Sequence, residues 1–211
     1  MTFSDYRLSE FLGAVRSSNP TPGGGSASAL AGAMGASLLA MVAGLPKSRA
    51  TTVEDVERLK AAGERCTMLA AELEALVERD SDAYNTVLAA YKLPKGTDEE
   101  KAARSTAIQA GFRAAIDAPL AVMRASAAAA EQGVVVATLG LASASSDVRV
   151  GIELLHAALR GAQLNVETNL GSVKDADYLA KVRADVVEFE RAIGHELDAV
   201  ETIHRRSRDQ K

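Results

Sequence analysis

One acidic residue stands where a packed helix needs an apolar side chain. Between residues 56 and 91, apolar and small side chains recur at alternating steps of three and four, the spacing of a helix that packs along its length against a neighbour. Asp80 occupies one of these positions, between Val77 and Tyr84. Burial disfavours an ionised carboxylate and raises its pKa, which suits a group that accepts and gives a proton near neutral pH. The alternative is a structural ion pair with a basic side chain of a neighbouring helix.

A run of three glycines forms the second candidate site. Gly23, Gly24 and Gly25 precede Ser26 and an uncharged stretch that predicts a helix. The free N–H groups and the positive dipole end of such a helix attract an anion or a carbonyl oxygen. No lysine follows the glycines and no strand precedes them, so neither a phosphate-binding loop nor a dinucleotide fingerprint is indicated. The alternative is a tight turn into a buried helix.

Two further pairs of polar residues have both a structural and a functional interpretation. Lys92 and Lys95 flank Pro94 and can pair with carboxylates of a ligand, although exposed lysines are common on any surface. Asn165 and Asn169 are one helical turn apart, so they serve either hydrogen bonds between helices or contacts with a ligand. For both pairs the sequence alone does not decide between the structural and the functional interpretation.

Other reactive residue types give little signal. On sequence alone Asp147 is a charge in the first turn of a helix. The three histidines are scattered, with no CxxC or HExxH pattern, so we expect no metal. Cys66 lies on the packed face and is predicted to be an inert core thiol. A single cysteine and an N-terminus without the pattern of a signal peptide lead us to expect a cytoplasmic protein.

Composition excludes several functional classes. The chain has 211 residues, 24 Lys+Arg against 28 Asp+Glu and a net charge of −4, which argues against a nucleic-acid-binding protein. Aromatic residues make up only 4%, with no Trp, so base stacking is not expected either. Hydrophobic residues make up 47%, and alanine, the strongest helix former, is frequent in every segment. The sequence therefore predicts an all-α protein.

Turn and capping signals divide the chain into helices. Ser4 is the predicted cap of a short first helix that ends before Ser17. Residues 17–46 carry no charge, but this stretch is rich in Gly, Ala and Ser and lacks an aromatic belt, so we expect a buried helix or a subunit interface rather than a membrane span. Further helices are predicted from Thr52 to about Tyr91, from residue 97 to about 140, from residue 147, and over the apolar steps between residues 179 and 200, before a polar tail at 205–211.

Two local expectations concern the later helices. Pro119 lies inside the pattern of the helix at 97–140 and should free the carbonyl group near Ala115. Ser146 is the predicted cap of the helix that begins at Asp147. No internal repeat or linker is visible, so residues 1–211 are predicted to form one domain, a bundle of long antiparallel helices around the Gly/Ala-rich helix.

Six blocks, in chain order, together resemble one family. The blocks are residues 19–26 with the following Ala/Gly helix, 80–84, 92–95, 117–120, 146–147, and 161–166 with 169–170. They are similar to the cyclodeaminase/cyclohydrolase family, which contains methenyltetrahydrofolate cyclohydrolases and the cyclodeaminase part of formiminotransferase-cyclodeaminase. The resemblance covers nearly the whole chain.

The resemblance implies an all-helical homodimer that acts on one-carbon forms of tetrahydrofolate. It places the catalytic aspartate at Asp80, which the packing pattern singles out independently. Either water adds to the 5,10-methenyl bridge to give 10-formyltetrahydrofolate, or 5-formiminotetrahydrofolate closes with loss of ammonia. The resemblance also implies substrate contacts at Gly23, Gly24, Gly25, Ser26, Tyr84, Lys92 or Lys95, Asp147, Asn165 and Asn169, with the lysines meeting the acidic tail of the folate.

One departure from the family pattern concerns the loop before Ser146. Family members commonly carry a Gly-Asn pair there, whereas Leu141 follows Gly140 in this chain. Of the two reactions we expect hydrolysis, because these 211 residues carry no formiminotransferase segment. The alternatives are a cyclodeaminase that releases ammonia and a non-catalytic helical dimer that binds folate or serves as a scaffold. No cofactor, metal, nucleic acid or membrane partner is expected.

Overall fold

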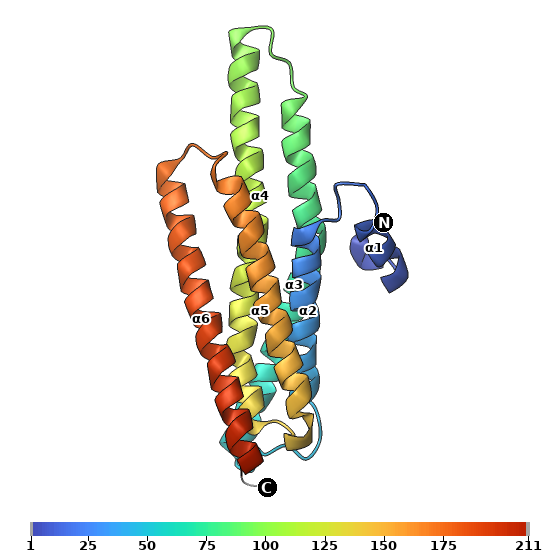
Figure 1. The fold of residues 1–211 in the computed structure, drawn as a ribbon, viewed down its shortest axis with the longest axis vertical. Coiled ribbons are helices and arrows are strands. Elements are labelled where there is room, and N and C mark those ends of the chain that lie inside the picture. Colours follow the sequence, from blue (N-terminus) through green and yellow to red (C-terminus); the bar gives the residue numbers. More distant parts are fainter. Residues whose placement is uncertain (1, 210–211) are drawn as a thin grey trace.

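The computed structural model describes residues 2–209 and is helical throughout its main elements (Figure 1). Long antiparallel helices form a bundle, which confirms the predicted all-α architecture. The helices are α1 (Leu8–Val15), α2 (Gly24–Ala43), α3 (Val53–Tyr91), α4 (Asp98–Leu139), α5 (Ser145–Leu170) and α6 (Ala176–Asp209), with short 3-10 helices η1 (Phe3–Asp5) and η2 (Ala142–Ala144).

The two longest helices begin at the caps that the sequence predicts. The Thr52 hydroxyl accepts a hydrogen bond from the Asp55 main-chain N–H at 3.1 Å, and α3 runs from there to Tyr91. Thr97 and Glu100 form a reciprocal capping box at the start of α4. Each cap satisfies main-chain donors that have no partner inside the helix.

Helix α2 packs between α3 and α5 and also contacts α4. Small side chains allow this close approach: a side chain on Gly35 would place its Cβ 2.6 Å from the carbonyl oxygen of Gly151 on α5. Both α2 and α4 are long and apolar enough to cross a membrane, but 50% and 67% of their most apolar windows are buried inside the protein. That burial is typical of core helices.

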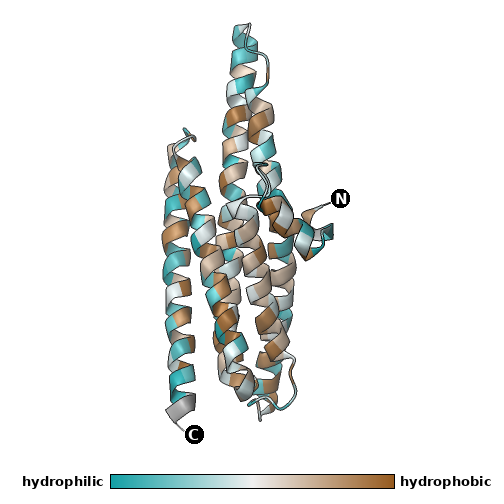
Figure 2. Cartoon of the chain, turned by 45° about the vertical axis from the view of Figure 1, so that its right-hand side comes forward, coloured by the Kyte–Doolittle hydropathy of each residue, from teal (hydrophilic) through white to brown (hydrophobic). Residues whose placement is uncertain are grey.

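The α3–α4 hairpin extends beyond the rest of the bundle, while α1 stands off to one side (Figure 1). Figure 2 shows a largely hydrophilic hairpin tip above an apolar middle. Pro119 lies inside α4 and cannot donate to the carbonyl of Ala115, and the Asn169 side chain of α5 donates to that oxygen at 3.3 Å. The predicted free carbonyl therefore joins α4 to α5.

Several of the helix boundaries predicted from the sequence are wrong. Helix α1 begins at Leu8, after Arg7, whereas Ser4 belongs to η1 and its side chain lies outside the described part of the chain. Helix α5 begins at Ser145, two residues before Asp147, because η2 leads directly into it and Ala144 precedes its first turn. Helix α6 continues to Asp209, into the segment predicted as a polar tail; residues 210–211 lie outside the described residues.

The packed face of α3 is shorter than the heptad pattern predicts. Its middle is buried, with Leu73 0% and Val77 3% exposed. Val56 and Tyr91, near the two ends, are 51% and 49% exposed, and the Tyr91 end extends beyond most of the bundle. Asp80 lies at the point where the buried part gives way to the extended hairpin.

A pair of glycine substitutions tests the close approach of α2 and α5. Gly35→Ala is expected to lower the free energy of unfolding by about 1–3 kcal/mol, because the added methyl group overpacks the contact. Gly194→Ala on α6 is the control, since a Cβ there meets nothing within 4 Å; helix propensity should make it stabilising by ~0.5–1 kcal/mol. Urea unfolding followed by circular dichroism measures both, and equal effects would contradict the packing described.

Candidate active site

The Asp80 carboxylate lies directly against the N-terminus of α2. Asp80 is half-buried on α3, and a Cβ on Gly25 would overlap its carboxylate oxygens. Only glycine therefore permits this approach of the two helices. The first turn of α2 presents unpaired main-chain N–H groups and the positive end of the helix dipole to the acid, as at an anion-binding helix terminus. The glycine turn and Asp80, predicted as two separate signals, form one site.

A buried hydroxyl network fixes this contact. The Ser26 hydroxyl is 2.8 Å from the Val77 carbonyl oxygen, 3.2 Å from the Ser81 hydroxyl and 3.3 Å from Asp80 Oδ2. Ser26 and Ser81 are 0% and 2% exposed. The Ser26 hydroxyl has a single proton to donate. Its shortest contact is to the Val77 carbonyl oxygen, so its hydrogen bond to Asp80 is the weaker of the two. The Ser26 main chain also donates a hydrogen bond to Asp80.

Opposing effects act on the protonation of Asp80. Burial raises the pKa of its carboxyl group above the usual value, and the hydrogen bonds from Ser26 pull it back down. Burial is the larger of these causes, so the pKa remains raised. A carboxyl group held in this way can take up a proton and release it again closer to neutral pH than an exposed aspartate can. No ion-pair partner for Asp80 occurs among the described residues, which argues against the structural interpretation of this acid.

The two asparagines of α5 lie beside the same end of α2. Asn165 lies next to Gly24, whose Cβ would be 3.7 Å from the Asn165 Nδ2 atom. Its amide donates to the Gly161 carbonyl at 2.8 Å, and the Asn169 amide donates to the carbonyls of Asn165 and Ala115 at 2.9 and 3.3 Å. Asn169 thus uses both amide hydrogens within the protein and joins two helices, so it can offer a ligand only its oxygen.

The remaining residues predicted on α3 lie along the hairpin. Tyr84 is one turn beyond Asp80 on the same face and is 41% exposed, so a ligand at Asp80 can contact its ring. Lys92 directly follows α3, twelve residues after Asp80 and about 18 Å away along the helix axis. Lys95 lines a separate cavity at the hairpin tip. Both lysines are too distant for the reacting carboxylate but lie at the same end of the molecule.

Asp147 is not brought to this cluster within one chain. It lies in the first turn of α5, 18 residues before Asn165 on the same helix, which is about 27 Å along the axis. The predicted contact between Asp147 and a ligand held at Asp80 is therefore not formed by a single chain, because a straight helix separates them. Leu141 lies at the same far end and packs against the hydrophobic core.

Sequence reasoning missed Ser81 and overlooked what sets Gly25 apart from its neighbours. Ser81 directly follows Asp80, and helical periodicity places it near the packed face of the helix. The sequence could therefore have predicted a buried hydroxyl group at this position. The role of Gly25 depends on the distance between two helices and had no local signal. Cys66 is confirmed as a core thiol, since it is 0% exposed and burial raises its pKa to about 12. Among the described residues, no group of three His, Cys, Asp or Glu could hold a metal ion.

Comparisons with known proteins show what the chain is similar to. Residues 7–188 match the family described as Formiminotransferase-cyclodeaminase. The chain is 40% identical over 168 residues to a methenyltetrahydrofolate cyclohydrolase of Methylorubrum extorquens, covering 80% of this chain and 81% of that protein. It is 35% identical to the formimidoyltransferase-cyclodeaminase of Sus scrofa, covering 83% of this chain but only 32% of that longer protein.

A solved structure shares the fold. The crystal structure of a formiminotetrahydrofolate cyclodeaminase from Thermotoga maritima superposes with a TM-score of 0.84 and covers 95% of this chain and 96% of its own. Sequence identity is 24%, so this likeness concerns the architecture.

The raised pKa of Asp80 has a consequence for stability. Because the folded protein holds this proton more tightly than the unfolded chain does, the stabilisation is fully present below the unfolded pKa and is lost as pH rises through the folded pKa. At pH 7.5 a larger fraction of the folded protein therefore carries this half-buried carboxyl group in its ionised form than at pH 4. Asp80→Asn should raise the melting temperature there by about 2–4 °C, and the gain should shrink toward pH 4.

Differential scanning calorimetry at the two pH values measures this effect. The matched control is Asp82→Asn, because Asp82 is exposed on the same helix and should leave the melting temperature unchanged at both. A destabilising Asp80→Asn at pH 7.5, or a gain independent of pH, would contradict the balance described for Asp80.

Proposed function

The chain belongs to the formiminotransferase-cyclodeaminase family, and from that premise we propose that it hydrolyses 5,10-methenyltetrahydrofolate to 10-formyltetrahydrofolate. The observation that carries this proposal is the Asp80 carboxylate, held with a raised pKa at the N-terminus of α2. The near full-length similarity to a methenyltetrahydrofolate cyclohydrolase supports the choice of reaction. The formimidoyltransferase-cyclodeaminases of Sus scrofa and Gallus gallus, of whose length the chain spans about a third, are less similar to it, at 35% and 33% identity. They support the ammonia-releasing alternative less well than the cyclohydrolase supports hydrolysis.

The first chemical step is attack of water on the methenyl carbon between N5 and N10. That carbon is electrophilic because the amidinium bridge is cationic, and the Asp80 carboxylate stabilises the positive charge before the attack. Asp80 then takes one proton from the attacking water as the C–O bond forms. The product of this step is a neutral tetrahedral carbon bearing a hydroxyl group, beside a protonated Asp80.

The second step opens the ring. The C–N5 bond breaks, Asp80 returns its proton to N5, and the hydroxyl group becomes the formyl carbonyl as its proton leaves to solvent. Methenyltetrahydrofolate and water thus give 10-formyltetrahydrofolate and one proton, with Asp80 restored. One acid/base group is enough because it acts on the two steps in turn, and a raised pKa serves both directions of transfer. Water is the only co-reactant, so no cofactor enters the proposal.

The polar groups around Asp80 then have distinct positions relative to the substrate. Tyr84 offers a ring face next to the reacting carbon, and the oxygen of Asn169 is an acceptor for the pterin. The first turn of α2 keeps the carboxylate in place. We place Asp147 outside the site of its own chain, in line with its distance from Asn165. A cytoplasmic location is part of the same proposal.

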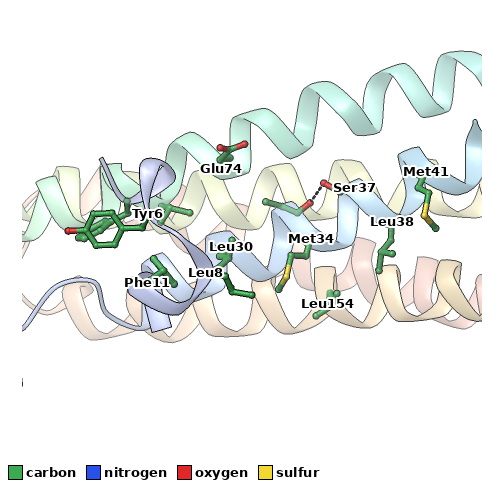
Figure 3. Close-up of a pocket in the computed structure, with 13 residues that line it drawn as sticks. Tyr6, Leu8, Phe11, Leu30, Met34, Ser37, Leu38, Met41, Glu74 and Leu154 are labelled. Atoms are coloured by element: carbon green, nitrogen blue, oxygen red, sulfur yellow. Dashed lines mark hydrogen bonds between the residues drawn. The ribbon is translucent and has the colours of Figure 1, made fainter. Parts of the chain in front are cut away.

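The proposal includes a homodimer, for which an apolar groove on another face of the bundle is the support (Figure 3). The groove has a volume of about 670 Å³, and among the described residues that line it only Glu74 is charged. Met34 and Met41 of α2 are each 45% exposed along it, in a helix that carries no charge. Other labelled side chains that line it come from α1, α2, α5 and the residue after η1, and they include Tyr6, Leu8, Phe11, Leu30, Leu38 and Leu154.

An activity assay tests the proposed reaction. Purified protein is mixed with 5,10-methenyltetrahydrofolate, and the loss of its near-ultraviolet absorbance is followed. Asp80→Asn should lower kcat at least 100-fold, because it removes the proton acceptor, while Asp82→Asn should keep kcat within about twofold of the native protein. Ammonia release from 5-formiminotetrahydrofolate is measured in parallel.

Each alternative gives a different outcome in this assay. No acceleration of either reaction by the native protein would overturn the enzymatic proposal in favour of a non-catalytic folate-binding or scaffold dimer. Ammonia release without hydrolysis would assign the cyclodeaminase reaction instead. Equal hydrolysis by the native protein and Asp80→Asn would remove Asp80 from the mechanism.

Light scattering at micromolar concentration tests the dimer. The native protein should have twice the mass of one chain, and the double variant Met34→Glu/Met41→Glu should be monomeric, because paired carboxylates cannot be buried in an apolar interface. Met68→Glu is the control, since Met68 is 57% exposed on α3 and does not line the groove. A monomeric native protein, or a dimeric double variant, would contradict this interface.

A further inference from the structure

A buried serine, Ser81, directly follows Asp80 on α3 and takes no part in the reaction steps described above. Its side chain is 2% exposed. In the part of the chain that the structure describes, its hydroxyl group has one hydrogen-bond partner, the Ser26 Oγ atom at 3.2 Å. A buried hydroxyl group that donates no hydrogen bond is costly. Ser81 is therefore the donor in this contact, and Ser26 accepts.

The Ser26 hydroxyl then has one proton of its own and two acceptors for it. The Val77 carbonyl oxygen lies at 2.8 Å and Asp80 Oδ2 at 3.3 Å. While Asp80 is protonated, the carbonyl oxygen is the closer acceptor. Once Asp80 is ionised, its carboxylate is the stronger acceptor, and a lone pair of Ser26 Oγ turned toward it would be repelled. The charge on Asp80 therefore decides which way the Ser26 proton points.

The hydrogen bond from Ser81 acts on Asp80 through Ser26. A hydroxyl group that accepts a hydrogen bond becomes a stronger donor, because each bond in a chain polarises the next one. The Val77 carbonyl can release the Ser26 proton, since it lies inside α3, where carbonyl groups accept main-chain hydrogen bonds from four residues further on. Donation from Ser81 therefore strengthens the hydrogen bond from Ser26 to the ionised Asp80.

Charged side chains beside Asp80 on α3 make their contacts elsewhere. Glu78 accepts a main-chain hydrogen bond from η1 at 2.7 Å. Arg79 lines a separate groove between α3 and α4, together with Arg124. Asp82 is exposed. These residues therefore leave the hydroxyl network as the polar surroundings of Asp80 on its own helix.

The elements packed against α3 lead to the same conclusion. Helix α2 carries no charged residue. On α4, Arg113 pairs with an aspartate of the segment between α5 and α6, and Asp117 accepts a hydrogen bond from a tyrosine hydroxyl of α6. Asp5 of η1 is engaged in the cap of η1 itself. The influences on the pKa of Asp80 are burial and the hydrogen bonds from Ser26, so a change at Ser26 changes the balance.

We propose that Ser81 is a positioning residue for the reaction, which donates to Ser26 and so directs the Ser26 hydroxyl at Asp80 whenever that carboxylate is ionised. The inference rests on the proposed function and adds a residue to it. Ionised Asp80 is the form that accepts a proton from water in the first step. While Asp80 then holds this proton, the Ser26 hydroxyl turns to Val77. Both serine protons stay on their own oxygens, so Asp80 alone exchanges a proton with the substrate.

The pH dependence of kcat/KM for hydrolysis provides the first test. In Ser81→Ala the ionised form of Asp80 loses part of its hydrogen bonding, so the pKa of Asp80 should rise. Because hydrolysis begins from the ionised form, the acidic limb of the profile should move to higher pH by about 0.5. Ser126→Ala is the matched control and should leave the limb in place. Ser126 is 0% exposed on α4, and its hydroxyl has no hydrogen-bond partner among the described residues.

NMR titration of the Asp80 carboxyl carbon provides a test that needs no catalysis. The midpoint should rise by about 0.5 in Ser81→Ala and by more in Ser26→Ala, which removes the donor itself. In Ser26→Ala/Ser81→Ala the midpoint should equal that of Ser26→Ala, because Ser81 acts on Asp80 only through Ser26. Circular dichroism verifies that each variant is folded.

The outcomes separate this inference from the proposed function. An unchanged midpoint in Ser81→Ala would overturn the inference, even if the variant hydrolysed more slowly, because a purely structural role does not move the titration. A lowered midpoint would overturn it as well, since Ser81 would then only compete for the Ser26 proton. A further rise in the double variant over Ser26→Ala would overturn the route through Ser26. The expected shifts in a protein without hydrolytic activity would support the link from Ser81 to Asp80 and overturn the proposed function alone.

Discussion

The structure depends on one contact, the approach of the Asp80 carboxylate to the first turn of α2. A charged group at the edge of a helical core is costly unless fixed dipoles and hydrogen bonds replace the water that it loses. Here the main chain around Gly25 and Ser26 supplies them, and it does so only because position 25 has no side chain. These hydrogen bonds offset only part of the cost of burial, so the pKa of Asp80 remains raised. The contact that holds the Asp80 carboxylate in place therefore also prepares it for proton transfer.

The rest of the fold maintains that contact. Glycine and alanine along α2 allow α3 and α5 to lie close on either side, as the contact of Gly35 with Gly151 illustrates. The hydrogen bond from Asn169 to the carbonyl freed by Pro119 ties α5 to α4 near the same end of the bundle. Beyond the first turn of α2, that helix no longer covers α3, which leaves Tyr84 exposed to a ligand.

Sequence patterns predicted the helices and the acid but not the geometry between them. Thr52 and Thr97 are local capping signals, so the starts of α3 and α4 could be predicted, and Asp80 interrupts a periodic face. The start of α5 depends on a short 3-10 turn that no capping side chain marks. Asp147 lies far from Asp80 because of the length of α5 and the order in which the helices pack. A resemblance between sequences does not reveal either of these. The cavity that Lys95 lines joins residues more than 60 positions apart.

The pKa of Asp80 is the quantity on which the account rests most directly. Titration of the Asp80 side-chain carboxyl carbon by NMR, assigned by comparison with Asp80→Asn, measures it in the folded protein. The account predicts a midpoint clearly above the value of 3.8 for an ordinary aspartate. A midpoint at or below that value would mean that hydrogen bonds outweigh burial, and it would contradict a role for Asp80 as the group that both accepts and returns the proton.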